Sequence, residues 1–120
     1  MASHNELGKK GEEIAADFLR NNGYQILEIN WRHQYLEVDL IALHKNLLVL
    51  IEVKTRSDLK FGLPLEAVTR KKEKNLIDAA EKYLEIKHLD NEVRFDIISV
   101  IESENSHSIR HIEDAFNAWS

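Results

Sequence analysis

Two β-forming segments joined by a very short connection dominate the middle of the sequence. Residues 37–43 and 47–54 are rich in apolar and β-branched side chains, and only the three residues 44–46 separate them. So short a link makes the second segment turn back along the first, which predicts an antiparallel β-hairpin. Residues 47–51 form the longest apolar run. A membrane-spanning helix needs about 20 apolar residues, so no such helix is expected.

The rest of the chain supplies two helices and further strands. Ser3 and Glu6 form a capping box that begins a helix over residues 3–22, and Gly23 ends it. Apolar side chains at helical spacing predict a second helix over residues 69–87. Strands are predicted at 24–31 and 93–101, a short edge strand at 108–112, and a terminal helical turn at 113–119 that packs on the sheet. The order is therefore αβββαβ with a small tail.

Length and composition fit one globular domain. The 120 residues are 43% hydrophobic and include no repeat, low-complexity tract or linker. The first residues lack the apolar region of a signal peptide, and cysteine is absent. The sequence therefore predicts a single cytoplasmic domain over residues 1–120. Any catalysis must use carboxylates, lysines, histidines or hydroxyls rather than thiols.

Charge is distributed unevenly along the chain. The formal net charge is −5, which argues against a general affinity for nucleic acid. Residues 54–74 nevertheless carry 7 basic and 3 acidic side chains. The basic ones include Arg70, Lys71, Lys72 and Lys74 at the start of the second predicted helix. Such a run is either a solvated helix face or a set of phosphate contacts.

The charged residues of the hairpin converge in only one of two registers. Side chains alternate along a strand, so Glu37, Asp39 and Ile41 are expected to share one face of their strand. In the next strand, Glu52 and Lys54 are likewise expected to share a face. If the turn contains two residues, Asp39 stands opposite Glu52 on the same face. If the register differs by one residue, the cluster dissolves. Two-residue turns are the commonest hairpin links.

A carboxylate pair of this kind favours a divalent cation. Asp39 and Glu52, with Glu12 available from the first helix, form an oxygen-rich site of the kind that Mg²⁺ or Mn²⁺ prefers. A metal there would polarise a phosphoryl oxygen and activate water, so a phosphodiester is the natural substrate. Lys54 would stabilise negative charge or help to deprotonate the water. The alternative is a salt bridge between Lys54 and one carboxylate, with Glu12 solvated at the margin of its helix.

A longer series of residues resembles a known family. Asp39 followed by Glu52, Val53 and Lys54 resembles the motif of the PD-(D/E)xK nuclease superfamily. The wider series is Gly11-Glu12, Gly23-Tyr24, Asn30, 37–41, 52–56, Phe61-Gly62, Lys72, 94–96 and 114–116. In order and spacing this series is similar to the bacterial YraN family (uncharacterised protein family 0102), which is distantly similar to archaeal Holliday-junction resolvases. One departure is Leu36, where the family has glycine, a change that would alter the local turn or narrow access for substrate.

The resemblance implies a fold and a set of site residues. The fold is a restriction-endonuclease-like α/β domain with a mixed central sheet flanked by helices. Asp39 and Glu52 match the metal-binding acids, Lys54 the catalytic lysine and Glu12 the helix glutamate that completes the site. The backbone carbonyl of Val53 is implied as a further metal ligand. The cofactor implied is Mg²⁺ or Mn²⁺.

The resemblance also implies a substrate and leaves a second hypothesis open. By analogy with the superfamily, the activity is endonucleolytic cleavage of DNA, on branched or otherwise structured forms. Arg56 and Lys72, with the neighbouring Arg70 and Lys71, would contact phosphates. A homodimer would follow because symmetric cutting of a four-way junction takes two active sites. The competing hypothesis is a binding module that docks nucleic acid or a protein on a nuclease fold without cutting.

Overall fold

The structure is a computed structural model, and it describes residues 4–56, 69–103 and 106–117. In chain order the elements are α1 (His4–Asn21), β1 (Gln25–His33), β2 (Leu36–His44), β3 (Leu47–Arg56), α2 (Arg70–Lys87), β4 (Val93–Ser103) and β5 (Ser106–Phe116). The predicted αβββαβ order is therefore confirmed, and the edge strand predicted at 108–112 is also present, as the longer β5. Ser3, Phe61 and Gly62, which belong to the sequence patterns above, and residues 118–119 of the predicted terminal turn lie outside the described residues.

Both helices end in the left-handed backbone conformation. Gly23 has a φ of 86°, and the N–H of Tyr24 donates to the carbonyl of Leu19 at 3.0 Å. This is the Schellman arrangement, and it confirms Gly23 as the end of the first helix. α2 ends in the same conformation at His88, whose φ is 54°. Both stops lie within two residues of the positions predicted from the sequence.

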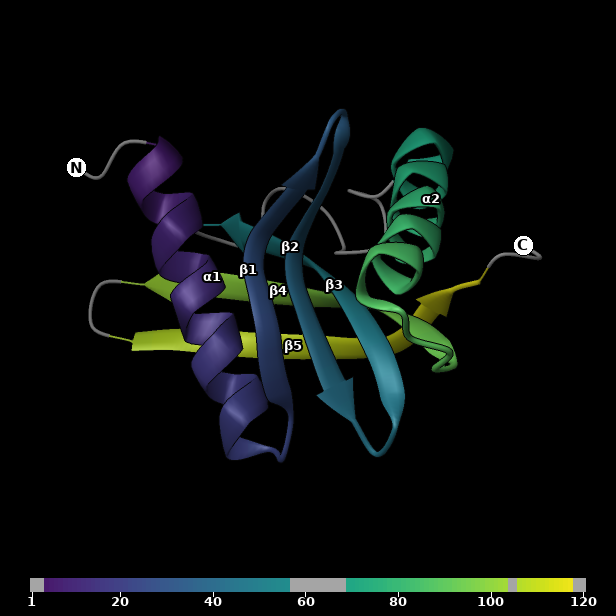
Figure 1. Cartoon of the computed structure of the whole chain (residues 1–120). Helices are drawn as coiled ribbons and strands as arrows, with labels where there is room; N and C mark the ends of the chain where they lie inside the picture. Colours follow the sequence, from purple (N-terminus) through teal and green to yellow (C-terminus); the bar gives the residue numbers. More distant parts are fainter. Residues whose placement is uncertain (1–3, 57–68, 104–105, 118–120) are drawn as a thin grey trace.

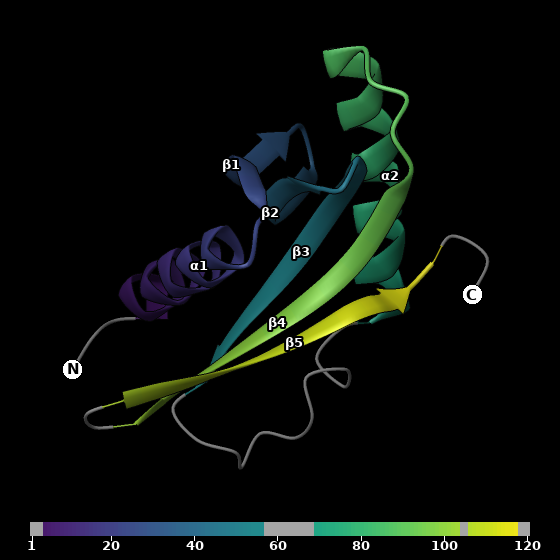
Figure 2. The ribbon, with the colours of Figure 1, turned by 90° about the horizontal axis from the view of Figure 1, so that it is seen from below.

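The five strands of the described residues form one mixed sheet in the order β1-β2-β3-β4-β5. β3 and β4 are parallel, and the other neighbouring pairs are antiparallel. A parallel pair needs a crossover connection, and α2 lies within it. Figures 1 and 2 show the sheet strongly twisted, with α1 and α2 on opposite sides of it.

The β2–β3 hairpin has the two-residue turn on which the predicted register depends. His44 pairs with Leu47, and Lys45 and Asn46 form the turn with φ values of 49° and 69°. Two successive positive φ values are what a type I′ turn requires, and this turn matches the twist of the flanking strands. Leu40 pairs with Ile51 in the same register, and the pairing ends there, one residue before Asp39 and Glu52.

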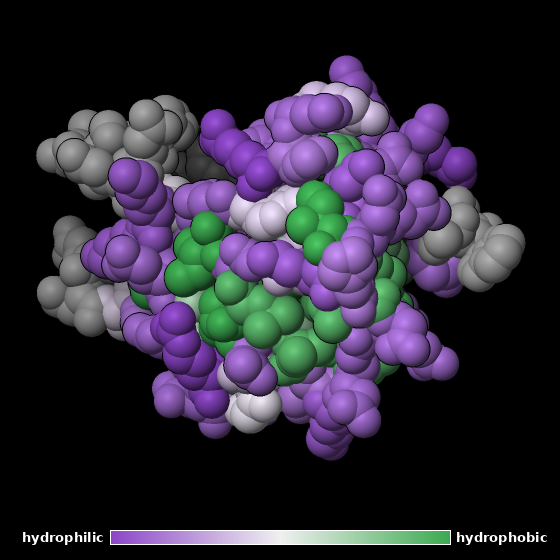
Figure 3. Space-filling model, viewed as in Figure 1, coloured by the Kyte–Doolittle hydropathy of each residue, from purple (hydrophilic) through white to green (hydrophobic). Residues whose placement is uncertain are grey.

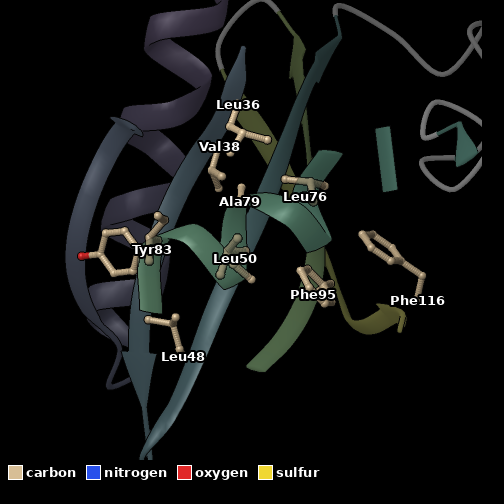
Figure 4. Packing of buried hydrophobic residues seen from close by; sticks show 11 residues of the cluster. Leu36, Val38, Leu48, Leu50, Leu76, Ala79, Tyr83, Phe95 and Phe116 are labelled. Atoms are coloured by element: carbon tan, nitrogen blue, oxygen red, sulfur yellow. The ribbon is translucent and has the colours of Figure 1, made fainter. Parts of the chain in front are cut away.

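Each face of the sheet carries one buried apolar layer. On the α2 side the buried residues are Leu36, Val38, Ile41, Leu48, Leu50, Leu76, Ala79, Ala80, Tyr83, Phe95 and Phe116 (Figure 4). On the α1 side they are Ala15, Ala16, Leu19, Tyr24, Leu40, Ala42, Val49, Ile51, Ile98 and Val100. Figure 3 shows further apolar surface between the two helices, surrounded by hydrophilic side chains. Within the described residues, no helix is long and apolar enough to cross a membrane.

The predicted helical turn after residue 112 is wrong for residues 113–116. β5 continues to Phe116, which pairs with Phe95 and stacks on its ring at a centroid distance of 5.0 Å. The strand continues through an irregularity in the pairing at Asp114, which has a φ of 52° and donates its N–H to buried Asp96. A strand contact with β4, remote in sequence, therefore decides the conformation of this segment.

Candidate active site

The sheet forks where β2 and β3 separate. The two strands pair from His44 and Leu47 as far as Leu40 and Ile51. Beyond this point the remaining residues of β2 pair with β1, and those of β3 pair with β4 through Arg56. The backbone groups of β3 that face the fork thus need a partner other than a neighbouring strand.

Side-chain alternation in β2 breaks at the fork. Val38 and Ile41 both pack in the α2-side layer, whereas Leu40 packs on the α1 side. Because Val38 and Ile41 are an odd number of residues apart, regular alternation does not hold through Asp39. The predicted common face of Glu37, Asp39 and Ile41 is therefore wrong. The first half of β2 separates from β3 and twists with β1, and this changes the direction in which its side chains point.

Asp39 closes the fork with its side chain. Its Oδ2 accepts a hydrogen bond from the N–H of Val53 at 2.8 Å, in the place where a strand carbonyl would otherwise lie. Burial raises the pKa of Asp39, the hydrogen bond from Val53 opposes that rise, and the negative charge of Glu12 adds to it. The carboxylate is thus fixed beside Val53 and close enough to Glu12 to respond to its charge.

Glu52 is a buried carboxylate with unequal surroundings at its two oxygens. The residue is 3% exposed. Its Oε1 lies 3.4 Å from Nζ of Lys54 and 3.6 Å from Nζ of Lys72. Its Oε2 is buried and has no hydrogen-bond partner among the described residues. Burial raises the pKa of Glu52, the charge of Asp39 raises it further, and the two lysines oppose the rise.

Glu12 reaches the fork from α1. The helix passes directly against the end of β3 at Gly11, where a Cβ atom would overlap the side chain of Thr55. Glu12 Oε2 accepts a hydrogen bond from Asn30 Nδ2 at 2.8 Å, and Asn30 has a φ of 55° within β1. Burial raises the pKa of Glu12, the bond from Asn30 lowers it, and the charge of Glu52 raises it.

Carboxylates from α1, β2 and β3 therefore lie near enough to one another at the fork to influence one another's pKa. The charge of Glu12 raises the pKa of Asp39, that of Asp39 raises the pKa of Glu52, and that of Glu52 raises the pKa of Glu12. In this conformation, no three acidic or histidine side chains of the described residues are positioned to hold a metal ion. The Oε1 atom of Glu52 instead contacts the two lysines.

The predicted basic residues divide between the site and its surroundings. Lys54 and Lys72 belong to the site through Glu52, and α2 brings Lys72 there from outside the hairpin. Arg70 and Lys71 are exposed on the first turn of α2. Arg56 ends β3, four residues and about 13 Å beyond Glu52 along an extended strand. The structure thus brings one of the four predicted nucleic-acid contacts into the carboxylate cluster.

Comparison with known proteins identifies the family. The model of the uncharacterised protein family UPF0102 matches residues 11–100. The chain belongs to this family. UPF0102 proteins of Christiangramia forsetii and Flavobacterium psychrophilum are 52% and 47% identical to it over 116 residues, 97% of this chain and 98% of each relative. A UPF0102 protein of Bacteroides thetaiotaomicron is 47% identical over 97% of this chain and 96% of its own.

The family membership confirms the resemblance at the level of UPF0102. All the residues at the fork lie within the matched segment, from Glu12 on α1 to Lys72 on α2. Leu36, the departure noted in the sequence, is buried in the α2-side layer. It is therefore a core residue of this UPF0102 chain.

Sequence reasoning assigned no role to a second polar cluster of the UPF0102 chain, on β4. Asp96 is 1% exposed and accepts from Arg94 Nε and Nη2, both at 2.9 Å, while His111 Nε2 lies 2.7 Å away. Arg94 Nη2 also donates to the hydroxyl of Tyr24 at 2.6 Å. Burial alone would raise the pKa of Asp96, but the bonds from His111 and Arg94 outweigh it and lower the pKa. The signal in the sequence was an Arg and an Asp two residues apart in an apolar strand.

Proposed function

We propose that this UPF0102 protein is a metal-dependent endonuclease that hydrolyses phosphodiester bonds in DNA. One observation carries the proposal: buried Glu52 meets Asp39, Glu12 and two lysines where the sheet forks. The resemblance of Asp39, Glu52 and Lys54 to the PD-(D/E)xK motif supports the same chemistry. Branched or otherwise structured DNA is the substrate form that the resolvase likeness favours.

The chemistry of the donors at the fork suits a hard divalent cation, which would have to draw their oxygens together, because the described residues are not positioned to hold one in this conformation. All the side-chain donors are carboxylate oxygens, the type that Mg²⁺ and Mn²⁺ prefer. Oε2 of Glu52 is buried without a hydrogen-bond partner in the described structure, so it has coordination capacity to spare. Glu12, Asp39, Glu52 and the carbonyl of Val53 would hold the ion. When bound, it would lower the pKa of a water molecule and polarise a phosphoryl oxygen.

The chain's own residues orient these groups and balance charge. Asn30 fixes the carboxylate of Glu12, and the N–H of Val53 fixes that of Asp39. The side chains of Lys54 and Lys72 are each about one-third exposed, and their ammonium groups lie beside Glu52. Cations placed there stabilise the negative charge that develops on phosphate oxygens in the transition state.

A non-catalytic binding module is the second candidate, and one observation favours it. Both lysine ammonium groups already neutralise Oε1 of Glu52, which is what a structural salt-bridge cluster would show. A nuclease fold with such a cluster would bind nucleic acid or a protein without cutting. The two candidates differ in whether the carboxylates are needed for any activity.

Cleavage of a DNA panel separates the two candidates. Labelled linear, flapped and four-way DNA is incubated with Mg²⁺ or Mn²⁺ and with the unmodified protein, Asp39→Asn or Glu52→Gln. We expect nicking of at least one substrate, its loss in both variants, and retained binding measured in EDTA. Glu85→Gln, an exposed carboxylate on α2, is the matched control and should cleave normally. A panel left uncut at millimolar metal, or cut equally by the variants, would overturn the nuclease proposal.

A further inference from the structure

A cavity of about 210 Å³ adjoins the fork between the β1–β2 turn and the first turn of α2. Its lining residues are Tyr35, Glu37, Thr69, Lys71, Lys72 and Asn75. Figure 1 shows the turn and the start of α2 at the same end of the molecule. Lys72 lines the cavity and also lies 3.6 Å from Glu52, so one side chain separates the cavity from the carboxylates.

The cavity wall formed by α2 is suited to an anion. Lys71 and Lys72 each carry an ammonium group. Both residues lie with Thr69 at the N-terminus of the 18-residue helix α2, which is the positive end of the helix dipole. Thr69 caps the helix by accepting from the N–H of Lys72 at 3.1 Å. The carboxylate on the opposite wall, Glu37, is compensated by Arg32 at 3.2 Å.

The other wall presents an aromatic ring to solvent on an anchored turn. Tyr35 is 74% exposed, unlike most large apolar side chains of the described chain. Its carbonyl accepts from Nδ2 of Asn75 at 3.4 Å, which ties the turn to α2. The Oδ1 of the same Asn75 is buried and lacks a hydrogen-bond partner within the described residues. The cavity therefore combines an exposed aromatic ring with the side chains of two lysines, of which Lys72 also contacts Glu52.

The aromatic ring suits the base of a nucleotide, and the cationic wall suits its phosphate. Exposed aromatic rings beside cationic grooves bind single-stranded nucleic acid, because bases stack on the ring while the backbone follows the charge. A base in a continuous duplex is already stacked between its neighbours and does not present a free face. Only an unpaired nucleotide can engage the ring and the cations together.

We propose that this cavity binds the nucleotide next to the cleaved phosphate, with its unpaired base stacked on Tyr35 and its phosphate at Lys71 and the start of α2. The inference rests on the proposed nuclease function and deepens it by naming the substrate class. That class is DNA with an unpaired nucleotide beside the cut, such as a flap or a single strand. An intact duplex lies outside it.

Binding without cleavage tests the inference. A labelled oligothymidine, a blunt duplex and a flapped duplex are titrated in EDTA, and affinity is measured by fluorescence anisotropy at fixed salt. Tyr35→Ala should weaken the single strand and the flapped duplex about tenfold or more and leave the blunt duplex unchanged. Tyr35→Phe keeps the ring and should restore the affinity. Ile86→Ala, which removes an exposed apolar side chain elsewhere on α2, is the control.

The outcomes distinguish the inference from the function on which it rests. Equal affinity of Tyr35→Ala and the unmodified protein for every probe overturns the inference, as does an equal loss on the blunt duplex or no binding to any probe. A loss in Tyr35→Phe as large as in Tyr35→Ala also overturns it, because the hydroxyl and not the ring would then matter. Binding that depends on Tyr35 without metal-dependent nicking leaves the nucleotide site standing and removes only the nuclease proposal.

Discussion

Glu52 combines deep burial with two nearby ammonium groups and a second oxygen that no described residue hydrogen-bonds. Burial and the charge of Asp39 raise its pKa in spite of the lysines. Leaving a buried polar atom unpaired costs about 1–3 kcal/mol. A residue that costs stability in the folded chain is typical of a site maintained for function rather than for packing.

The cost in stability that Glu52 imposes can be measured from how the free energy of unfolding changes with pH when Glu52 is replaced. The pKa values of Glu12, Asp39 and Glu52 are raised in the folded chain above their ordinary values of 4.5, 3.8 and 4.5. At a pH just above these ordinary values, the three carboxyl groups therefore bind more protons in the folded chain than in the unfolded chain. The free energy of unfolding should therefore rise as pH falls from neutral toward about pH 5. Glu52→Gln should be more stable than the unmodified protein at neutral pH and show a smaller rise, in urea titrations with EDTA. Glu85→Gln should keep the full rise, and an unchanged slope in Glu52→Gln would contradict the account.

The register of the hairpin was predictable as far as its two-residue turn sets it, from His44 and Leu47 to Leu40 and Ile51. Glu52 and Lys54 share a face of β3 as strand alternation predicts, and Nζ of Lys54 lies 3.4 Å from Glu52. The bond from Val53 to Asp39 was not predictable, because it depends on β2 leaving β3 for β1, which is a tertiary event. Tyr35 carried no local signal beyond being a single aromatic residue at a turn.

At the scale of elements, the contact between α1 and β3 positions Glu12. Gly11→Ala should destabilise the protein by about 1–3 kcal/mol, because the added methyl group overlaps Thr55 in a packed contact. Gly8→Ala is the matched control, since no atom lies within 4 Å of the added Cβ. It should stabilise the helix by about 0.5–1 kcal/mol. Urea unfolding measures both, and a stabilising Gly11→Ala would show that α1 does not pack as described.

The polar cluster on β4 joins β4 to β5 and to Tyr24, the residue before β1. Asp96→Asn should cost about 3–5 kcal/mol, because it leaves Arg94 without its buried counterion. The pKa of Asp96 is lowered, so its contribution is present at neutral pH and is lost as pH falls below the ordinary value of 3.8. The pH range in which Asp96 changes the stability therefore lies below the range in which Glu52 does. A loss under about 1 kcal/mol at neutral pH, measured by urea unfolding, would contradict a stabilising role.

At the scale of the whole molecule, local sequence signals predicted the element order and the ends of the helices. Gly23, the Lys45-Asn46 turn and the apolar periodicity of α2 act within a few residues, and each prediction based on them is confirmed. The segment at 113–116 was predicted wrongly because its conformation depends on pairing with Phe95 and Asp96, about twenty residues away. The fork itself arises from strand order and twist, which no short stretch of sequence specifies.

The central claim is that the carboxylates at the fork act together on one divalent cation. Calorimetric titration of Mn²⁺ and Mg²⁺ into the protein tests it most directly, with Glu12→Gln compared with Glu13→Gln, its exposed neighbour on α1. We predict saturable binding, weakened at least about tenfold by Glu12→Gln and by Glu52→Gln and unchanged by Glu13→Gln. No binding at millimolar metal, or equal binding by all the variants, would contradict the claim and leave the fork as a salt-bridge cluster.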